Sequence, residues 1–300
     1  MSFASIEAML DAAEENNCSL QEAICLSDCA ESGISEEASR EQMHYLWQVM
    51  KKTSADYKAS DRSNSGLIGG EAQKLHDAAE KGILLGDQYF TDVIEEALKT
   101  AECNACMKRI VAAPTAGSCG VIPAVLLPYA KKYKLPDETM ENALYVAAGI
   151  GQVIAARASL AGAEGGCQAE VGAASAMAAA ALTYLMGGSP KQSANAVAIA
   201  LGNLLGLVCD PVAGLVEVPC VKRNVIGATN AISSANMAIA GLTSCIPADE
   251  VIDAMGEVGD LMNSDLRETG IGGLAGTPTA KKITRELRNK ATERVQGDAS

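Results

Sequence analysis

Aromatic side chains are scarce in this sequence of 300 residues. Phe, Trp and Tyr make up only 3% of the chain, although 48% of the residues are hydrophobic. The apolar residues are mostly Ala, Leu, Val, Ile and Met. These residues suit closely packed helices better than sheets, since sheets favour aromatic and β-branched side chains. The composition therefore predicts an all-α protein.

Positive charge is also in short supply. The chain has 24 Lys and Arg against 37 Asp and Glu, which gives a formal charge of −13. We exclude nucleic acid as a partner, because phosphate binding needs a basic surface. A small anionic substrate would instead need a local positive spot, such as a helix N-terminus or a metal ion.

Two kinds of hydrophobic segment are missing. The N-terminus shows no basic region followed by an apolar one, so we expect no signal peptide and a cytoplasmic protein. The nearly uncharged run 171–186 is short, rich in Ala and Gly, and preceded directly by Glu170, which predicts a buried helix and no membrane span. The ten cysteines are accordingly expected as reduced thiols or metal ligands, not as disulfides.

Start and stop signals divide the chain into helices. Ser19 and Glu22 have the spacing of a capping box, and Ser189 before Pro190 is an N-cap followed by proline in the first helical position. The helices expected after the one that begins at residue 19 span 35–50, 71–81, 88–100, 121–133, 136–161, 170–185, 190–208, 221–242, 248–262 and 278 onward.

We expect one compact multi-helix domain over residues 1–300. A composition shift near Thr100 divides a polar helical layer, 1–100, from an Ala- and Gly-rich helical core, 101–290, and the polar tail 291–300 is expected to fray. Small side chains, as in the run 172–182, allow helix axes to approach closely and lose little rotamer entropy on burial. Such packing would make a rigid frame for a site carried on the loops.

Cys167, Cys209 and Cys220 are the residues most indicative of function. Each lies in a stretch broken by Gly or Pro, outside a regular element, and a cysteine that only packs needs no such backbone. Three thiolates with no obvious fourth can hold an iron–sulfur cluster in which one iron stays open. An open iron is a Lewis acid, which predicts an enzyme.

Other cysteines offer a rival interpretation. Cys103 and Cys106 form a C-x-x-C pair, and Cys25 and Cys29 lie one helical turn apart, so the four could bind zinc in a non-enzymatic helical protein. The sequence has no second C-x-x-C pair, which favours buried or incidental thiols. Cys119 is interpreted as a bystander near the site.

The Gly-rich loops 63–70 and 270–276 also have two interpretations. They could be helix C-caps and turns, or their backbone N–H groups could bind a carboxylate together with neighbouring serines. We expect Ser65 and Gly66 to bind the substrate. Neither loop has the pattern of a dinucleotide-binding or phosphate-binding loop.

Five stretches make the chain resemble the α subunit of the iron–sulfur-dependent bacterial L-serine dehydratases, over roughly residues 35–290. The stretch with two cysteines, Cys209-Asp-Pro-Val-Ala-Gly-Leu-Val-Glu-Val-Pro-Cys220, is long and unusual and carries most of the specificity. The other four stretches are Ser65–Gly70, Ala113–Pro123, Glu164–Gly172 and Gly270–Gly276.

The resemblance implies an all-helical fold and the deamination of L-serine to pyruvate and ammonia. It implies a [4Fe-4S] cluster bound by Cys167, Cys209 and Cys220, no pyridoxal phosphate, and Thr115 and Gly117 as further substrate-binding residues. An L-cysteine desulfidase on the same scaffold is the alternative, because a sulfur leaving group would also bind the open iron.

The resemblance also implies a partner. Single-chain members of the family begin with another domain, whose Ser/His-rich motif resembles the source of the catalytic base, and this chain lacks that motif. Its two histidines, His44 and His76, lie on amphipathic helices and are expected to be structural. We therefore expect the base on a β subunit, in a heterodimer or higher oligomer. The last cysteine is Cys245, so the terminal cysteine of some single-chain relatives has no counterpart.

Overall fold

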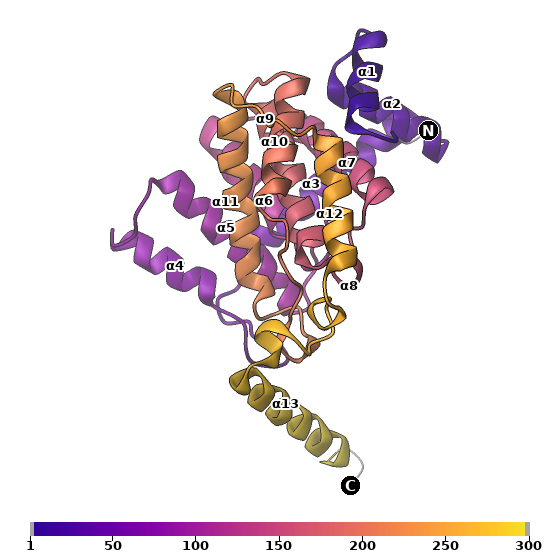
Figure 1. The fold of residues 1–300 in the computed structure, drawn as a ribbon. Helices are drawn as coiled ribbons and strands as arrows, with labels where there is room; N and C mark the ends of the chain where they lie inside the picture. Colours follow the sequence, from indigo (N-terminus) through magenta and orange to yellow (C-terminus); the bar gives the residue numbers. More distant parts are fainter. Residues whose placement is uncertain (1–2, 298–300) are drawn as a thin grey trace.

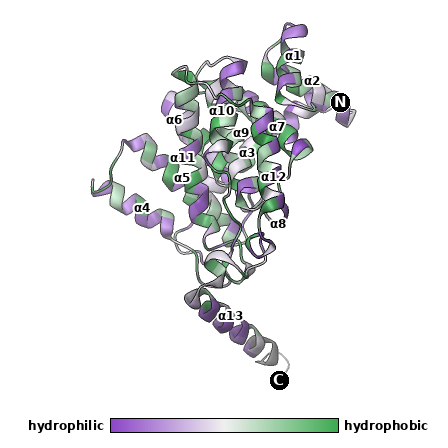
Figure 2. Cartoon of the chain, in the orientation of Figure 1, coloured by the Kyte–Doolittle hydropathy of each residue, from purple (hydrophilic) through white to green (hydrophobic). Residues whose placement is uncertain are grey.

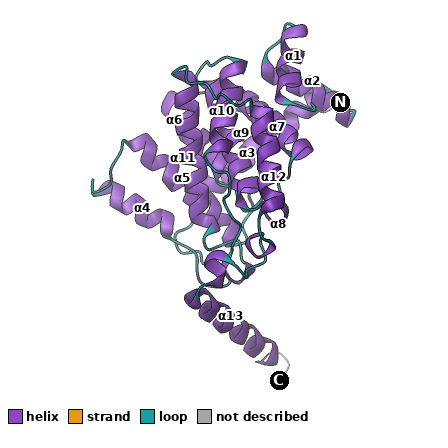
Figure 3. Ribbon diagram, in the orientation of Figure 1, coloured by secondary structure: helices purple, strands orange, loops and turns teal. Residues whose placement is uncertain are grey.

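The fold is built from helices, as expected. The structure, a computed structural model, describes residues 3–297, and this part of the chain contains no strand (Figure 3). The α-helices are α1 (Ile6–Glu15), α2 (Leu20–Ser32), α3 (Glu36–Ala55), α4 (Glu71–Glu80), α5 (Gln88–Ala105), α6 (Val121–Tyr133), α7 (Asp137–Arg157), α8 (Gly162–Gly165), α9 (Ala173–Leu185), α10 (Pro190–Gly202), α11 (Cys220–Ile239), α12 (Ala248–Leu261) and α13 (Pro278–Gly297). A π-helix, η1 (Gln168–Gly172), precedes α9, and 3₁₀ turns lie at η2 (Val212–Gly214), η3 (Ser264–Leu266) and η4 (Gly273–Gly276). The all-α prediction is confirmed.

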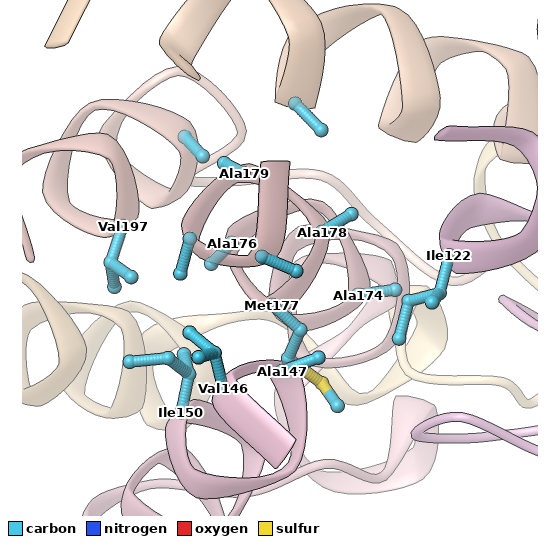
Figure 4. Packing of buried hydrophobic residues seen from close by; sticks show 14 of the residues in the cluster. Ile122, Val146, Ala147, Ile150, Ala174, Ala176, Met177, Ala178, Ala179 and Val197 are labelled. Carbon is cyan, nitrogen blue, oxygen red and sulfur yellow. The ribbon is translucent and has the colours of Figure 1, made fainter. Parts of the chain in front are cut away.

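Helix α9 forms the centre of the molecule. It packs against α6, α7, α10 and α11 (Figure 1), and every residue from Ala173 to Thr183 is buried. Figure 4 shows its alanines facing Val197 of α10 and Ile122 of α6, while Met177 reaches toward Ala147 of α7. The nearly uncharged run is therefore a buried helix, as predicted.

The first hundred residues contribute to the same core. Buried residues such as Met9 of α1, Ile24 of α2, Trp47 of α3 and Val93 of α5 belong to the main hydrophobic cluster with α9. Helix α13 instead extends away from the body (Figure 1) and is mostly hydrophilic (Figure 2). It is described through Gly297, so only the last three residues of the expected frayed tail, 298–300, lie outside the described residues.

The sequence signals for helix starts are confirmed. Ser19 and Glu22 form the capping box of α2, and the Ser189 hydroxyl accepts the N–H of Gln192 at the start of α10. The predicted end of α10 at residue 208 is wrong, because the chain leaves the helix after Gly202 and Gly206 adopts a left-handed φ of 82°. Glycine favours such conformations and ends helices.

Several connecting loops gather at the end of the helical body from which α13 extends (Figure 3). The predicted break at 162–166 contains the single turn α8, and the helix predicted from residue 170 begins as the π-helix η1. A π-helical turn inside a helix is rare and is frequently found at functional sites. No helix in the described residues is both long and apolar enough to cross a bilayer.

Candidate functional site

The fold brings Cys167, Cys209 and Cys220 together at this loop-rich end. Cys167 directly precedes η1, Cys209 lies in the loop after α10, and Cys220 is the first residue of α11. The prediction that all three lie outside regular elements is wrong for Cys220, because α11 starts directly after Pro219. A thiol in the first turn of a helix gains from the positive end of the helix dipole, which favours its thiolate form.

The three thiols are buried and affect one another electrostatically. Burial raises the pKa of Cys167 to about 11 and that of Cys220 to about 12. Burial also raises the pKa of Cys209, and the neighbouring Cys167 and Cys220 raise it further. Three buried thiols this close together are therefore neutral unless a cationic group joins them.

Arg223 brings positive charge to this group. Its guanidinium forms a buried ion pair of 2.8 Å with Asp210 and donates to the carbonyl oxygen of Val208 at 2.7 Å. It also lies beside Cys167, where it opposes the effect of burial on the pKa of that thiol. The arginine thus links α11 to the loop that carries Cys209.

The Gly-rich loop of residues 270–276 packs against the loop that carries Cys209 and Asp210. The backbone N–H of Leu274 donates to Asp210 Oδ2 at 2.7 Å, and a Cβ at Gly273 would lie 2.3 Å from that oxygen. Only glycine permits this approach, and Gly273 also has a left-handed φ of 57°. Two backbone hydrogen bonds, Cys209 to Leu266 and Glu268 to Cys209, extend the attachment.

Glu170 lies at the centre of the candidate site. Its Oε1 accepts the hydroxyl of Thr115 at 2.6 Å, and its Oε2 lies 3.8 Å from the Sγ of Cys209, which donates to it. A Cβ at Gly117 would lie 3.0 Å from Glu170 Oε1, and a Cβ at Gly162 would lie 2.6 Å from Oε2. Two of the predicted substrate-binding residues, Thr115 and Gly117, therefore lie around one carboxylate beside a predicted cluster ligand.

Asn224 fixes the loop that carries Thr115. Its Oδ1 accepts the N–H of Gly120 at 2.8 Å, and its Nδ2 donates to the carbonyl oxygens of Gly117 and Cys220 at 2.9 and 3.0 Å. The side chain is buried and has no access to water, so its amide must find its hydrogen-bond partners within the protein. The 113–120 loop is thus held to the first turn of α11.

Ser65 and Gly66 lie in a neighbouring loop. The hydroxyls of Ser63 and Ser65 both donate to the buried carboxylate of Glu217, which lies between Cys209 and Cys220 in the sequence. Gly66 has a left-handed φ of 79° and donates its N–H to the carbonyl oxygen of Ser63. The serine loop therefore already binds one carboxylate, that of Glu217.

The histidines lie on other parts of the helical body. His44 of α3 pairs with Glu141 at 2.7 Å and is about half exposed, and His76 of α4 pairs with Glu95 at 3.1 Å. Cys119 is buried beside the carbonyl oxygen of Thr100.

The remaining cysteines are dispersed. Cys25 and Cys29 lie on α2, Cys103 lies on α5 and Cys106 directly after it, and Cys245 is exposed. Within residues 3–297 no three His, Cys, Asp or Glu side chains lie close enough to share a single metal ion, so the four cysteines of the rival interpretation form no such group.

The donor set at the loop-rich end fits an iron–sulfur cluster. Each cysteine of such a cluster binds a different iron, so the thiols of Cys167, Cys209 and Cys220 need not converge on one point. They are buried, they affect each other's pKa, and they come from separate segments that can surround a group larger than one ion. Thiolates are also the ligands that iron–sulfur clusters prefer.

Sequence reasoning did not assign roles to Glu170, Arg223 and Asn224. A signal existed for Glu170, the lone carboxylate at the edge of an uncharged run and within one of the five distinctive stretches. Arg223 and Asn224 follow Cys220 by three and four residues, which is one helical turn. Their partners come from loops distant in sequence, so only the fold identifies them.

Comparisons with known proteins extend over nearly the whole chain. Residues 7–275 match the family described as serine dehydratase alpha chain. The chain is 45% identical over 285 residues to the probable L-serine dehydratase alpha chain of Bacillus subtilis (strain 168), with 95% of each chain covered. It is 43% identical over 280 residues to the L-serine dehydratase alpha chain of Peptoniphilus asaccharolyticus, covering 93% of this chain and 96% of that one. L-serine dehydratase 2 of Escherichia coli (strain K12) is 40% identical over 256 residues, which span 80% of this chain and 54% of that protein.

Proposed function

We propose, since the chain belongs to the serine dehydratase alpha chain family, that it is the catalytic α chain of an L-serine ammonia-lyase. The reaction converts L-serine to pyruvate and ammonia. The observation that carries the proposal is the similarity to two proteins named as L-serine dehydratase alpha chains, which covers more than nine tenths of this chain and of each relative.

We further propose that Cys167, Cys209 and Cys220 hold a [4Fe-4S] cluster, with no pyridoxal phosphate involved. When bound, the cluster would supply a Lewis-acidic iron with an open position, which assists the departure of the serine hydroxyl group. The proposal is supported by the burial of the three thiols, their mutual electrostatic influence and the Arg223 guanidinium beside Cys167. That guanidinium would favour the thiolate form that ligation requires.

The protein around these cysteines would keep the reacting groups in place. Arg223 and Leu274 hold Asp210, and Asn224 holds the loop of Thr115 against α11. The ion pair is buried and the two hydrogen bonds are part-buried, and together they restrict the movement of the loops. Polar groups held in fixed positions strengthen the electrostatic interactions that act on a leaving hydroxide.

The chemistry requires one base. Loss of the Cα proton and of hydroxide from L-serine gives aminoacrylate and water. Aminoacrylate then tautomerises to an imine, which a water molecule hydrolyses to pyruvate and ammonia. His44 on α3 is paired with Glu141 of α7, and His76 on α4 is paired with Glu95 of α5, so we propose that the base comes from a β chain.

Reconstitution tests this function. The α chain is purified anaerobically, its cluster is rebuilt with iron and sulfide, and pyruvate formation from L-serine is measured with and without a β chain. We expect turnover only with both chains. L-cysteine serves as the comparison substrate, with sulfide release measured in parallel.

Each outcome is decisive. Pyruvate formation that needs iron, sulfide and both chains supports the proposal. Full turnover by the α chain alone would refute the division between two chains and would make His44 and His76 the candidates for the base. Preferential release of sulfide from L-cysteine would replace the dehydratase by a desulfidase.

A further inference from the structure

Glu170 is a carboxylate without a cation. It is partly buried on the π-helix η1, and its partners are the hydroxyl of Thr115 and the thiol of Cys209. Within residues 3–297, no Lys, Arg or His forms an ion pair with it. The nearby carboxylate of Glu268 adds further negative charge to this region. A desolvated carboxylate that lacks a counter-charge is costly and calls for a cationic partner.

The backbone of two glycines packs closely against this carboxylate. Gly117 lies on one loop and Gly162 at the start of α8. A methyl group at Gly162 would approach both Glu170 Oε2, at 2.6 Å, and Cys209 Sγ, at 3.0 Å. On the side next to the proposed cluster ligand, the carboxylate is therefore approached by glycine backbone and by the Cys209 thiol, and by no cationic side chain.

The expected substrate carries the missing cation. An α-amino acid presents an ammonium group, a carboxylate and, in serine, a hydroxyl group on adjacent carbons. If the hydroxyl binds the open iron of a cluster that Cys209 helps to hold, the ammonium would be only a few bonds away and so in the neighbourhood of Glu170. An ammonium–carboxylate hydrogen bond in a partly buried site is among the stronger polar contacts.

We propose that Glu170 binds the α-ammonium group of the amino-acid substrate, an assignment that rests on the proposed function. The carboxylate then selects α-amino acids over hydroxy acids and orients Cα relative to the proposed cluster. Thr115 is a positioning residue, because its hydroxyl holds Oε1 and leaves Oε2 directed toward Cys209.

The test uses a pair of ligands that differ only in the ammonium group. L-alanine carries ammonium and carboxylate, propanoate carries the carboxylate alone, and neither has a leaving group. Their dissociation constants are measured by calorimetry on the cluster-loaded αβ complex, for the wild type and for Glu170→Gln, which keeps the shape and removes the charge. The matched control is Glu164→Gln, an exposed carboxylate in the same stretch whose partner is Ser159.

We expect Glu170→Gln to weaken L-alanine binding on the order of 10- to 100-fold, the range for a lost charged hydrogen bond, and to leave propanoate binding unchanged. The KM for L-serine should rise by a similar factor, with a smaller effect on kcat. Iron and sulfide content should equal that of the wild type. Glu164→Gln should change none of these quantities.

Other outcomes overturn the assignment. Equal weakening of both ligands would make Glu170 a purely structural partner of Thr115, and loss of iron would make it part of the cluster's support. A fall in kcat with unchanged L-alanine binding would make it an acid–base group. If the wild type binds L-alanine but forms no pyruvate, the proposed reaction fails while the ammonium site stands.

Discussion

Asn224 donates a hydrogen bond of 2.9 Å from its amide to the carbonyl oxygen of Gly117. The two residues are 107 positions apart in the sequence, and the bond joins the helix that begins with Cys220 to the loop that carries Thr115. The proposed cluster ligands and the proposed substrate-binding residues are thus joined by one part-buried hydrogen bond. Substitution of Asn224 therefore tests whether the two sets of residues depend on this hydrogen bond.

Replacement of Asn224 should loosen this connection. Asn224→Ala leaves the buried N–H of Gly120 without a partner and removes a part-buried hydrogen bond to the carbonyl oxygen of Gly117. Unpaired buried groups cost roughly 1–3 kcal/mol each, so we expect the free energy of unfolding to fall by about 2–4 kcal/mol. Chemical denaturation of the metal-free protein measures it. Asn236→Ala, at an exposed position of the same helix, is the control and should cost less than about 0.5 kcal/mol.

Replacement of any one of the three proposed cluster ligands should abolish cluster binding. Cys167→Ser, Cys209→Ser and Cys220→Ser each replace a thiolate by a hydroxyl, which is a poor ligand for iron–sulfur clusters. We expect loss of the visible absorbance, of most bound iron and of pyruvate formation. Cys18→Ser, at a half-buried position between α1 and α2, should retain all three. Full iron content in all three single variants would contradict the assignment.

A methyl group added at Gly162 should also reduce cluster binding, here by steric clash and without removing a ligand. The Cβ of Gly162→Ala would lie 2.6 Å from Glu170 Oε2 and 3.0 Å from Cys209 Sγ, so both groups must move. We expect bound iron to fall by at least half while the helical circular dichroism persists. The control is Gly202→Ala at the exposed end of α10, where a Cβ meets nothing within 4 Å. Alanine there should be neutral or stabilising by up to about 1 kcal/mol.

Asp137 should give the stability a measurable pH dependence. Hydrogen bonds from Lys51, at 2.6 Å, and from Trp47 and Gln48 lower the pKa of Asp137 from 3.8 to about 2. A carboxyl whose folded-state pKa lies below its unfolded value stabilises the fold above the unfolded pKa. That contribution is lost as the pH falls from about 4 to about 2.

The matching experiment compares Asp137→Asn with the wild type. Because Asp137 is partly exposed, solvent screening reduces its contribution, and we expect a loss on the order of 1 kcal/mol at pH 7. The difference between the two proteins should shrink as the pH is lowered below about 4. Glu138→Gln, at the exposed next position of α7, is the control. A difference independent of pH would show that charge has no part in the effect.

Local sequence signals predicted where helices begin more reliably than where they end. Ser189 and Pro190 define the start of α10 because an N-cap depends on residues within one turn. Its end came six residues earlier than predicted, after Gly202, since the Leu-rich residues that follow continue an apolar pattern without continuing the helix. A pattern of hydrophobic residues predicts that a segment is buried, but it does not distinguish a buried turn from a buried helix.

The residue types of the candidate site could be listed from the sequence, whereas their arrangement in space could not. The spacing of Cys209 and Cys220 identified candidate metal ligands because ligand type is a property of single residues. The contact of Thr115 with Glu170 joins residues 55 positions apart, and that of Ser65 with Glu217 joins residues 152 apart. Such pairs depend on how α5, α9 and α11 pack, which no local pattern contains.

The central helix α9 has a consequence for how this sequence can change. Ten of its positions, from Ala173 to Leu182, are entirely or almost entirely enclosed by other helices, and seven of these are alanine. Almost every substitution there adds atoms, and overpacking a filled core costs roughly 1–3 kcal/mol. Larger residues are thus disfavoured at the alanine positions of α9. Glycine, the only smaller residue, lowers helix stability. Libraries designed for this protein should leave α9 unchanged and place their diversity on the surfaces of α3, α4 and α13.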